Sequence, residues 1–235
     1  MDDITIQTVL VARNYLYRAL QAVLGEDPTE EMLSVLFSET TDMALECFAG
    51  AESGAYAAAR ADLQRCREAC EGNRGAYLEA AKRDYMHVLV GPHELKAPPW
   101  ECVYLTNERV LFQEATLKVR EAYRSQNMLP TQYPHVSDDH IAIELDFMAK
   151  LSAKCQAAFE AGEAGEYRRL LETQRGFLKE HLLVWVERYA DDLAEDAPGS
   201  LYACVGKLCA AFLPLDFELA GELLALGEDA ADAGE

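Results

Sequence analysis

The chain has 235 residues, half of them hydrophobic, and a formal net charge of −20. This length is enough for one large domain or two small lobes with a buried core. The negative charge disfavours binding to nucleic acid or to anionic membrane surfaces and favours a basic partner. Glycine and proline number only 14 and 8, and this composition favours an all-α fold over a sandwich or a barrel.

Seven cysteines are scattered through the chain, and several, such as Cys204 and Cys209, lie within apolar runs. This usage is typical of reduced thiols in a cytoplasmic protein rather than of a disulfide framework. The N-terminal segment is acidic where an export signal would be basic, and no apolar run is long enough to cross a bilayer. We therefore expect a cytoplasmic protein without stable membrane insertion.

The first half of the chain has apolar side chains at helical spacing, separated by turn signals. The segment 91–106 lacks this period and has three prolines, which predicts an ordered, proline-rich loop. Helices are predicted over residues 4–24, 29–37, 41–48, 56–70, 76–90 and 109–123.

Residues 125–137 contain two prolines and no periodicity, which predicts a hinge. The hinge divides the chain into an N-terminal helical lobe over 1–124, which includes the loop 91–106, and a C-terminal lobe over 138–227. An acidic tail follows over 228–235. In the second half, helices are predicted over residues 137–159, 167–193, 201–212 and 216–226.

Two aspartates and a histidine, Asp138, Asp139 and His140, stand at the predicted start of a helix. Aspartates at this position are typical cap and first-turn residues, so their presence can be explained without any further function. Helical spacing places His140 and Glu144 one turn apart at the edge of the apolar face, in reach of each other. The cluster is thus compatible with a structural role, with acid–base or metal chemistry, or with binding of another protein.

Motifs of catalysis are missing from the sequence. There is no nucleophile elbow, phosphate-binding loop or dinucleotide fingerprint. None of the five histidines follows a glutamate by three residues, and Cys66 and Cys70 lack a second closely spaced pair. We therefore expect no catalytic residue, no metal and no cofactor. The alternatives are a helical hydrolase or metal enzyme that uses the Asp-Asp-His cluster, and a generic acidic helical scaffold.

Four motifs occur in a defined order along the chain. They are YMHVLVGP at 85–92, PPWECVY at 98–104, SDDH at 137–140 with ELDFM at 144–148, and the set Phe177, His181 and Trp185. In these motifs the sequence resembles the TorD/DmsD/NarJ family of cytoplasmic chaperones for molybdoenzymes that are exported by the twin-arginine route. The resemblance covers about residues 10–220. It departs from the family where Val88 and Leu89 replace leucine and phenylalanine, and where Val136-Ser137 replaces glutamate and proline.

The resemblance implies a single-chain helical bundle that binds the twin-arginine signal peptide of a molybdoenzyme precursor. Such a chaperone holds the precursor from export until its cofactor is inserted and the enzyme has folded. The implied partner is the apo-form of the catalytic subunit, and the chaperone itself is not an enzyme. A monomer and a dimer are both compatible with the sequence.

A receptor for a twin-arginine signal needs acceptors for two guanidinium groups beside apolar walls. The candidate acceptors are Glu101, Asp138, Asp139 and Glu144, and the candidate walls are Tyr85, Val88, Leu89, Trp100, Phe147 and Leu151. By the resemblance, Asp139 and His140 also face the binding cleft. The negative charge of the chain would speed encounter with a basic segment and make binding sensitive to salt.

Overall fold

The structure, a computed structural model, describes residues 1–50, 54–91, 94–106, 114–129 and 137–232. Within these ranges there is no strand, and one isolated antiparallel bridge joins Trp100 to His140. The predicted all-α fold is confirmed. The helices are α1 (Asp3–Gly25), α2 (Glu30–Leu36), α3 (Glu39–Glu46), α4 (Gly54–Gly72), α5 (Arg74–Tyr85), α6 (Glu101–Leu105), α7 (Glu114–Ser125), α8 (Ile141–Glu160), α9 (Ala164–Glu180), α10 (Val186–Asp196) and α11 (Leu201–Asp232), with a π-helical turn η1 (Met86–Val90) and a 3-10 turn η2 (Leu182–Val184).

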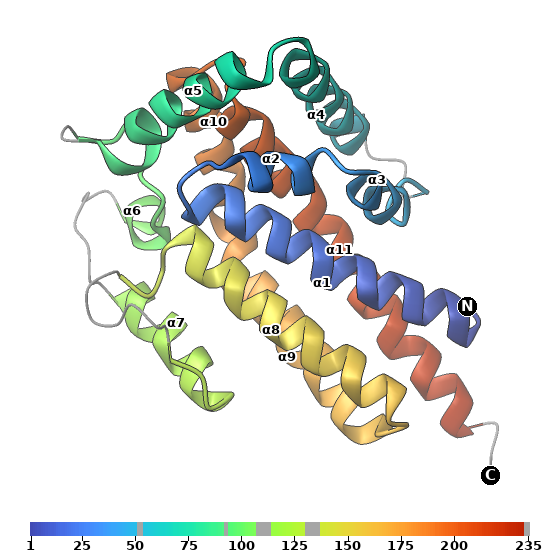
Figure 1. Cartoon of the computed structure of the whole chain (residues 1–235). Coiled ribbons are helices and arrows are strands. Elements are labelled where there is room, and N and C mark those ends of the chain that lie inside the picture. The colour runs from blue at the N-terminus through green and yellow to red at the C-terminus, as the bar shows by residue number, and fades with distance from the viewer. Residues whose placement is uncertain (51–53, 92–93, 107–113, 130–136, 233–235) are drawn as a thin grey trace.

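Helices α1 and α8 lie side by side and run in opposite directions through the bundle (Figure 1). The Asn14 side-chain amide donates a 2.8 Å hydrogen bond to the backbone carbonyl of Ala149. Where α1 ends, a Cβ added at Gly25 would lie only 2.5 Å from the Cβ of Ala142. A glycine at this position therefore lets the end of α1 approach the start of α8 closely.

A buried polar group ties α1, α9 and α11 together inside the core. The Arg13 guanidinium forms an ion pair of 2.5 Å with Asp216, and neither side chain is exposed. Arg13 also donates to Gln174 at 2.9 Å, and the Tyr17 hydroxyl donates to Asp216 at 2.6 Å. Buried charges are tolerated when they are paired and hydrogen-bonded in this way.

The first two helices, α1 and α2, start within one residue of their predicted starts, and α3 starts two residues earlier than predicted. The Asp2 side chain accepts from the backbone N–H of Thr5, and the Thr29 hydroxyl accepts from that of Met32. Ser38 caps α3 in the same manner. Side-chain oxygens at these positions satisfy backbone donors that a helix leaves unpaired.

Two predictions for the segment 76–106 need correction, and the described residues cover a third only in part. The helix predicted over 76–90 ends as α5 at Tyr85 and continues as the π-helical turn η1, closed by a 2.7 Å bond from the Gly91 N–H to the Met86 carbonyl. The loop predicted over 91–106 contains the short helix α6. For the helix predicted over 109–123, the structure describes α7 from Glu114, and residues 107–113 lie outside the described ranges.

In the second half, three predicted helices were wrong in their continuity. The one predicted over 167–193 breaks at His181, whose φ and ψ of −122° and −82° are not helical, and it becomes α9, η2 and α10. The two predicted over 201–212 and 216–226 form the single helix α11, which contains Pro214. Pro214 is exposed, and the solvent-facing side of a long helix tolerates the bend that proline causes. Helix α11 continues through Asp232, into the predicted acidic tail.

One hydrophobic core contains side chains from both predicted lobes. Leu16 and Leu20 of α1 belong to the same cluster as Leu145 of α8 and Phe212 of α11. Helix α11 also packs against α4. The division into two lobes with a hinge stays a prediction, and residues 130–136 of that hinge lie outside the described part of the chain.

Candidate functional site

The candidate site lies where the proline-rich segment meets the start of α8. The backbone N–H of Ile141 donates to the Pro99 carbonyl at 2.9 Å, and the N–H of Glu101 donates to the Asp139 carbonyl at 3.0 Å. The Trp100 and His140 rings meet edge to face with their centroids 5.6 Å apart. This short bridge places the PPWECVY and SDDH motifs beside each other.

Asp139 holds α6 in place. One of its carboxylate oxygens accepts a 2.9 Å hydrogen bond from the backbone N–H of Cys102, and the other accepts one from the Ser137 hydroxyl. Helix α6 has no side-chain cap of its own, so this carboxylate supplies one from a distant part of the chain. Asp139 is fully buried in this arrangement.

Asp138 ties α7 to the same junction. Its carboxylate is paired with the guanidinium of Arg120, and its backbone carbonyl accepts a 2.9 Å hydrogen bond from the Tyr123 hydroxyl. The Asp138 side chain is fully buried, and its Oδ1 atom has no hydrogen-bond partner among the described residues. One acceptor position of this carboxylate is therefore unused.

His140, not the aspartates, caps α8, so the helix predicted from residue 137 begins at Ile141. The His140 Nδ1 atom accepts a 3.1 Å hydrogen bond from the backbone N–H of Ala142, which requires an unprotonated Nδ1. Burial lowers the pKa of His140 to about 4, although the nearby Asp139 acts in the opposite direction. The imidazole is therefore neutral at pH 7.

The break between α9 and α10 brings two more side chains to the carboxylates. The His181 Nδ1 atom lies 3.1 Å and 3.3 Å from the two carboxylate oxygens of Glu101, and both side chains are buried. The Trp185 indole N–H donates to Glu144 at 3.4 Å. The helix break at His181 thus lies at the point where these two side chains contact the carboxyl groups.

Glu144 is buried among other acids. Its Oε1 atom has no hydrogen-bond partner among the described residues, and its side chain is fully enclosed. Burial raises the pKa of Glu144 well above 4.5, and the neighbouring Glu101 and Asp139 raise it further. Since a buried carboxylate without a cation is costly, burial here favours the protonated form of this carboxyl group.

The junction thus gathers four buried carboxyl groups and one guanidinium, that of Arg120. The four are Glu101, Asp138, Asp139 and Glu144. Such a cluster can accept donors from a cationic group that displaces its present partners. Across the described ranges, no three histidine, cysteine, aspartate or glutamate side chains are placed to hold a metal ion.

The predicted apolar walls fall into two groups. Val88, Phe147 and Leu151 are buried in the core, and the Phe147 ring packs against those of Tyr123 and Phe177. They line no surface in this conformation. By contrast, Tyr85, Leu89 and Trp100 are partly exposed, as is the predicted site residue His140.

Some contributors to the site were missed by the sequence analysis. Arg120 and Tyr123 hold Asp138 from α7, and only their helical spacing of three could have suggested a common face. Exposed apolar side chains were also missed on elements that adjoin the proline-rich segment. These are Met86 and Val90 of η1, Leu105 of α6 and Val184 of η2.

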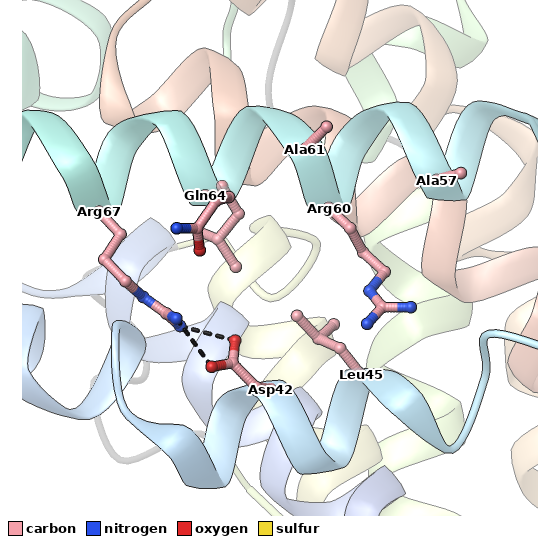
Figure 2. A pocket seen from close by; sticks show the side chains of 8 residues that line it. Asp42, Leu45, Ala57, Arg60, Ala61, Gln64 and Arg67 are labelled. Carbon is pink, nitrogen blue, oxygen red and sulfur yellow. Dashed lines mark hydrogen bonds and ion pairs between the residues drawn. The ribbon is translucent and has the colours of Figure 1, made fainter.

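A separate pocket lies between α3 and α4, away from this junction, and its side chains are drawn in Figure 2. Arg67 reaches from α4 to both carboxylate oxygens of Asp42 at 2.6 and 2.7 Å. Arg60 pairs with Glu46 at 2.6 Å. Because both arginines are engaged with α3, this pocket holds two helices together and offers no obvious anion site.

Comparison with known proteins gives a consistent result. The family described as nitrate reductase delta subunit matches residues 52–191, which is more than half of the chain. A relative named chaperone protein TorD from Aliivibrio fischeri is 30% identical over 155 residues, covering 66% of this chain and 70% of its own length. A second protein of that name from Vibrio cholerae is 25% identical over 201 residues, covering 81% and 89%. A Tat proofreading chaperone DmsD from Salmonella typhi is 28% identical over 130 residues, covering 55% and 57%.

The chain is thus similar, over much of its length, to proteins that are named as chaperones. The chain belongs to the nitrate reductase delta subunit family, which includes the TorD and DmsD relatives that its motifs resemble. Among the described residues, no helix combines the length and the apolar character required to cross a membrane.

Proposed function

We propose that this protein is a maturation chaperone that binds the twin-arginine signal peptide of a molybdoenzyme precursor. It holds the precursor from export until the cofactor is inserted and the enzyme has folded. It acts in the cytoplasm, on the apo-form of the catalytic subunit, and it catalyses no reaction. The names of its relatives, chaperone protein TorD and Tat proofreading chaperone DmsD, carry this proposal.

The chemistry of the junction supports the same function. Two guanidinium groups of a signal would find carboxylate acceptors, and the apolar segment that follows them would find exposed apolar side chains on η1, α6 and η2. Each arginine–carboxylate contact at a desolvated site would contribute about 1.5–3 kcal/mol. The unused acceptor Asp138 Oδ1 is a position where such a contact would add a bond rather than exchange one.

The site works in two steps under this proposal. The partly exposed side chains Tyr85, Leu89, Trp100 and His140 meet the peptide first. The segment 98–105 then shifts from the start of α8, which uncovers the buried carboxylates. The contacts that this shift has to break include two backbone hydrogen bonds to the start of α8 and the cap that Asp139 provides to α6. They also include the contact of Glu101 with His181 and the hydrogen bond from the Tyr104 hydroxyl to Asp192.

The direct test is capture of the client from the host. The tagged full-length protein is pulled from cells that express their molybdoenzymes, and the bound polypeptides are identified by mass spectrometry. The proposal expects a molybdoenzyme precursor that still carries its twin-arginine leader. Recovery of unrelated proteins alone, with the enzymes present in the lysate, would contradict it.

A further inference from the structure

A pocket of about 300 Å³ opens between α4, α5 and the start of α11, on elements that take no part in the junction described above. Its lining includes Cys66 of α4, Tyr77 of α5 and Cys204 of α11. Helices α4 and α11 pack directly against each other in this region. Two cysteines from distant parts of the chain therefore share one cavity.

The two thiols contact each other. A hydrogen bond joins the side chains of Cys66 and Cys204, and Tyr77 lines the same pocket. The exposed fractions of Cys66 and Cys204 are 9% and 5%, so access to the sulfur atoms is through the pocket. All seven cysteines are reduced in the structure.

The surroundings make the two thiols unequal. The hydrogen bond from Cys204 and the charge of Arg65 lower the pKa of Cys66, against the effect of burial. The same hydrogen bond and burial raise the pKa of Cys204. Arg65 is itself paired with Asp62, and Lys207 adds a second positive charge at the pocket. One thiolate-forming cysteine beside one protonated cysteine is the arrangement of a nucleophile with a resolving thiol.

We propose that Cys66 and Cys204 form a hydroperoxide-reactive dithiol, whose oxidation closes a disulfide bond between α4 and α11. The inference rests on the shared pocket, on the contact between the two thiols and on the neighbouring Tyr77 and Lys207. It does not depend on the chaperone function.

The chemistry is balanced with a hydroperoxide as oxidant. The Cys66 thiolate attacks the outer peroxide oxygen, the O–O bond breaks, and the leaving alkoxide or hydroxide takes up a proton to give an alcohol or water. Cys66 becomes a sulfenic acid. The Cys204 sulfur then attacks the Cys66 sulfur, the S–O bond breaks, and water leaves as the disulfide forms. Two thiols lose two electrons and the peroxide gains them.

The bond would join the predicted N-terminal lobe to the last helix of the predicted C-terminal lobe. Because α4 and α11 already pack together, the bond would fix an existing contact between them rather than create a new one. Oxidised protein would therefore keep its helical content while resisting separation of these two helices.

The test treats the full-length reduced protein with hydrogen peroxide and then counts free thiols after denaturation. The expected result is a loss of two of the seven thiols, with one disulfide-linked peptide pair that contains Cys66 and Cys204. In Cys204→Ser, a dimedone-type reagent should trap a sulfenic acid at Cys66 and no disulfide should form. In Cys66→Ser, the rate of thiol loss should fall by about tenfold or more.

Cys70→Ser is the matched control, since Cys70 is buried on the same helix one turn beyond Cys66 and does not line the pocket. It should react like the unaltered protein, and circular dichroism should confirm that every variant is folded. Retention of all seven thiols, or a disulfide that forms equally well in Cys66→Ser or Cys204→Ser, would overturn the proposal.

Discussion

The carboxylate of Asp139 accepts a 2.9 Å hydrogen bond from the backbone N–H of Cys102, which joins the start of α8 to the first turn of α6. The acidic motif that precedes α8 was predicted to cap that helix, and this contact gives it a different role. The motif fastens the proline-rich segment to the bundle, and the histidine after it caps the helix. Under the proposed function, binding and stability would therefore be coupled at this junction.

Replacing Asp139 by alanine should destabilise the protein by about 1–3 kcal/mol, because the Cys102 N–H and the Ser137 hydroxyl lose their acceptor inside the protein. Urea denaturation measures this loss. The control is Asp146→Ala on the same helix, where an exposed pair with Lys150 is broken and the change should be below about 1 kcal/mol. Equal effects of the two substitutions would show that the cap contributes nothing special.

Replacing Asp216 by alanine should have a larger effect, about 3–5 kcal/mol, since it leaves the Arg13 guanidinium buried without its counter-ion. The measurement is again the free energy of unfolding. Glu114→Ala, which removes the partner of exposed Lys118, is the matched surface control and should change stability little. A loss under 1 kcal/mol for Asp216→Ala would contradict the pairing across α1 and α11.

The His140 cap predicts a particular response to acid. The folded-state pKa of about 4 lies below the ordinary value of 6.5, so the unfolded chain takes up a proton first. The contribution of the neutral His140 side chain to the free energy of unfolding is complete above pH 6.5. It is lost as the pH falls towards 4, by up to about 3 kcal/mol. His140→Asn keeps a cap acceptor and should lose less stability than the unaltered protein between pH 7 and 4.5. Parallel pH profiles of the two proteins would argue against a neutral histidine cap.

The raised pKa of Glu144 predicts the opposite dependence of stability on pH. Its pKa is raised in the folded state, so its contribution is complete below the unfolded value of 4.5 and is lost as the pH rises through the folded value. Glu144→Gln, which cannot ionise, should therefore be more stable than the unaltered protein at pH 8, and the gain should shrink at pH 5. Glu187→Gln on the exposed side of α10 serves as the control and should show no such trend. A Glu144→Gln variant that is less stable at pH 8 would contradict the buried protonated carboxyl.

The sequence predicted the helices well where local signals decide. Thr29 caps α2 and Gly25 ends α1, as their residue types indicate. The prediction from sequence failed where contacts with distant residues determine where a helix ends. The break at His181 occurs because the His181 and Trp185 side chains turn towards Glu101 and Glu144, and Pro214 remains inside α11 because its ring faces solvent.

Only part of the site was predicted, because local spacing does not reveal contacts between distant residues. Local spacing identified Asp138, Asp139 and His140 as a group at a helix start, and the structure brings them beside Trp100 and Glu101. Spacing could not reveal that Asp139 caps a different helix, because that helix lies almost forty residues earlier in the chain. Nor could it reveal that the acids are buried, since burial depends on α6, α7 and the break before α10.

The most direct test of the chaperone assignment is the affinity of the purified protein for a synthetic twin-arginine signal peptide, measured by calorimetry beside a peptide in which both arginines are lysines. The account predicts saturable binding of the arginine peptide, weaker binding of the lysine peptide, because lysine cannot form the planar two-bond contact, and an affinity that falls as salt is raised. It also predicts that His140→Ala weakens binding while Glu187→Ala does not. Failure to bind the arginine peptide, or equal binding of both peptides that is unaffected by salt, would contradict it.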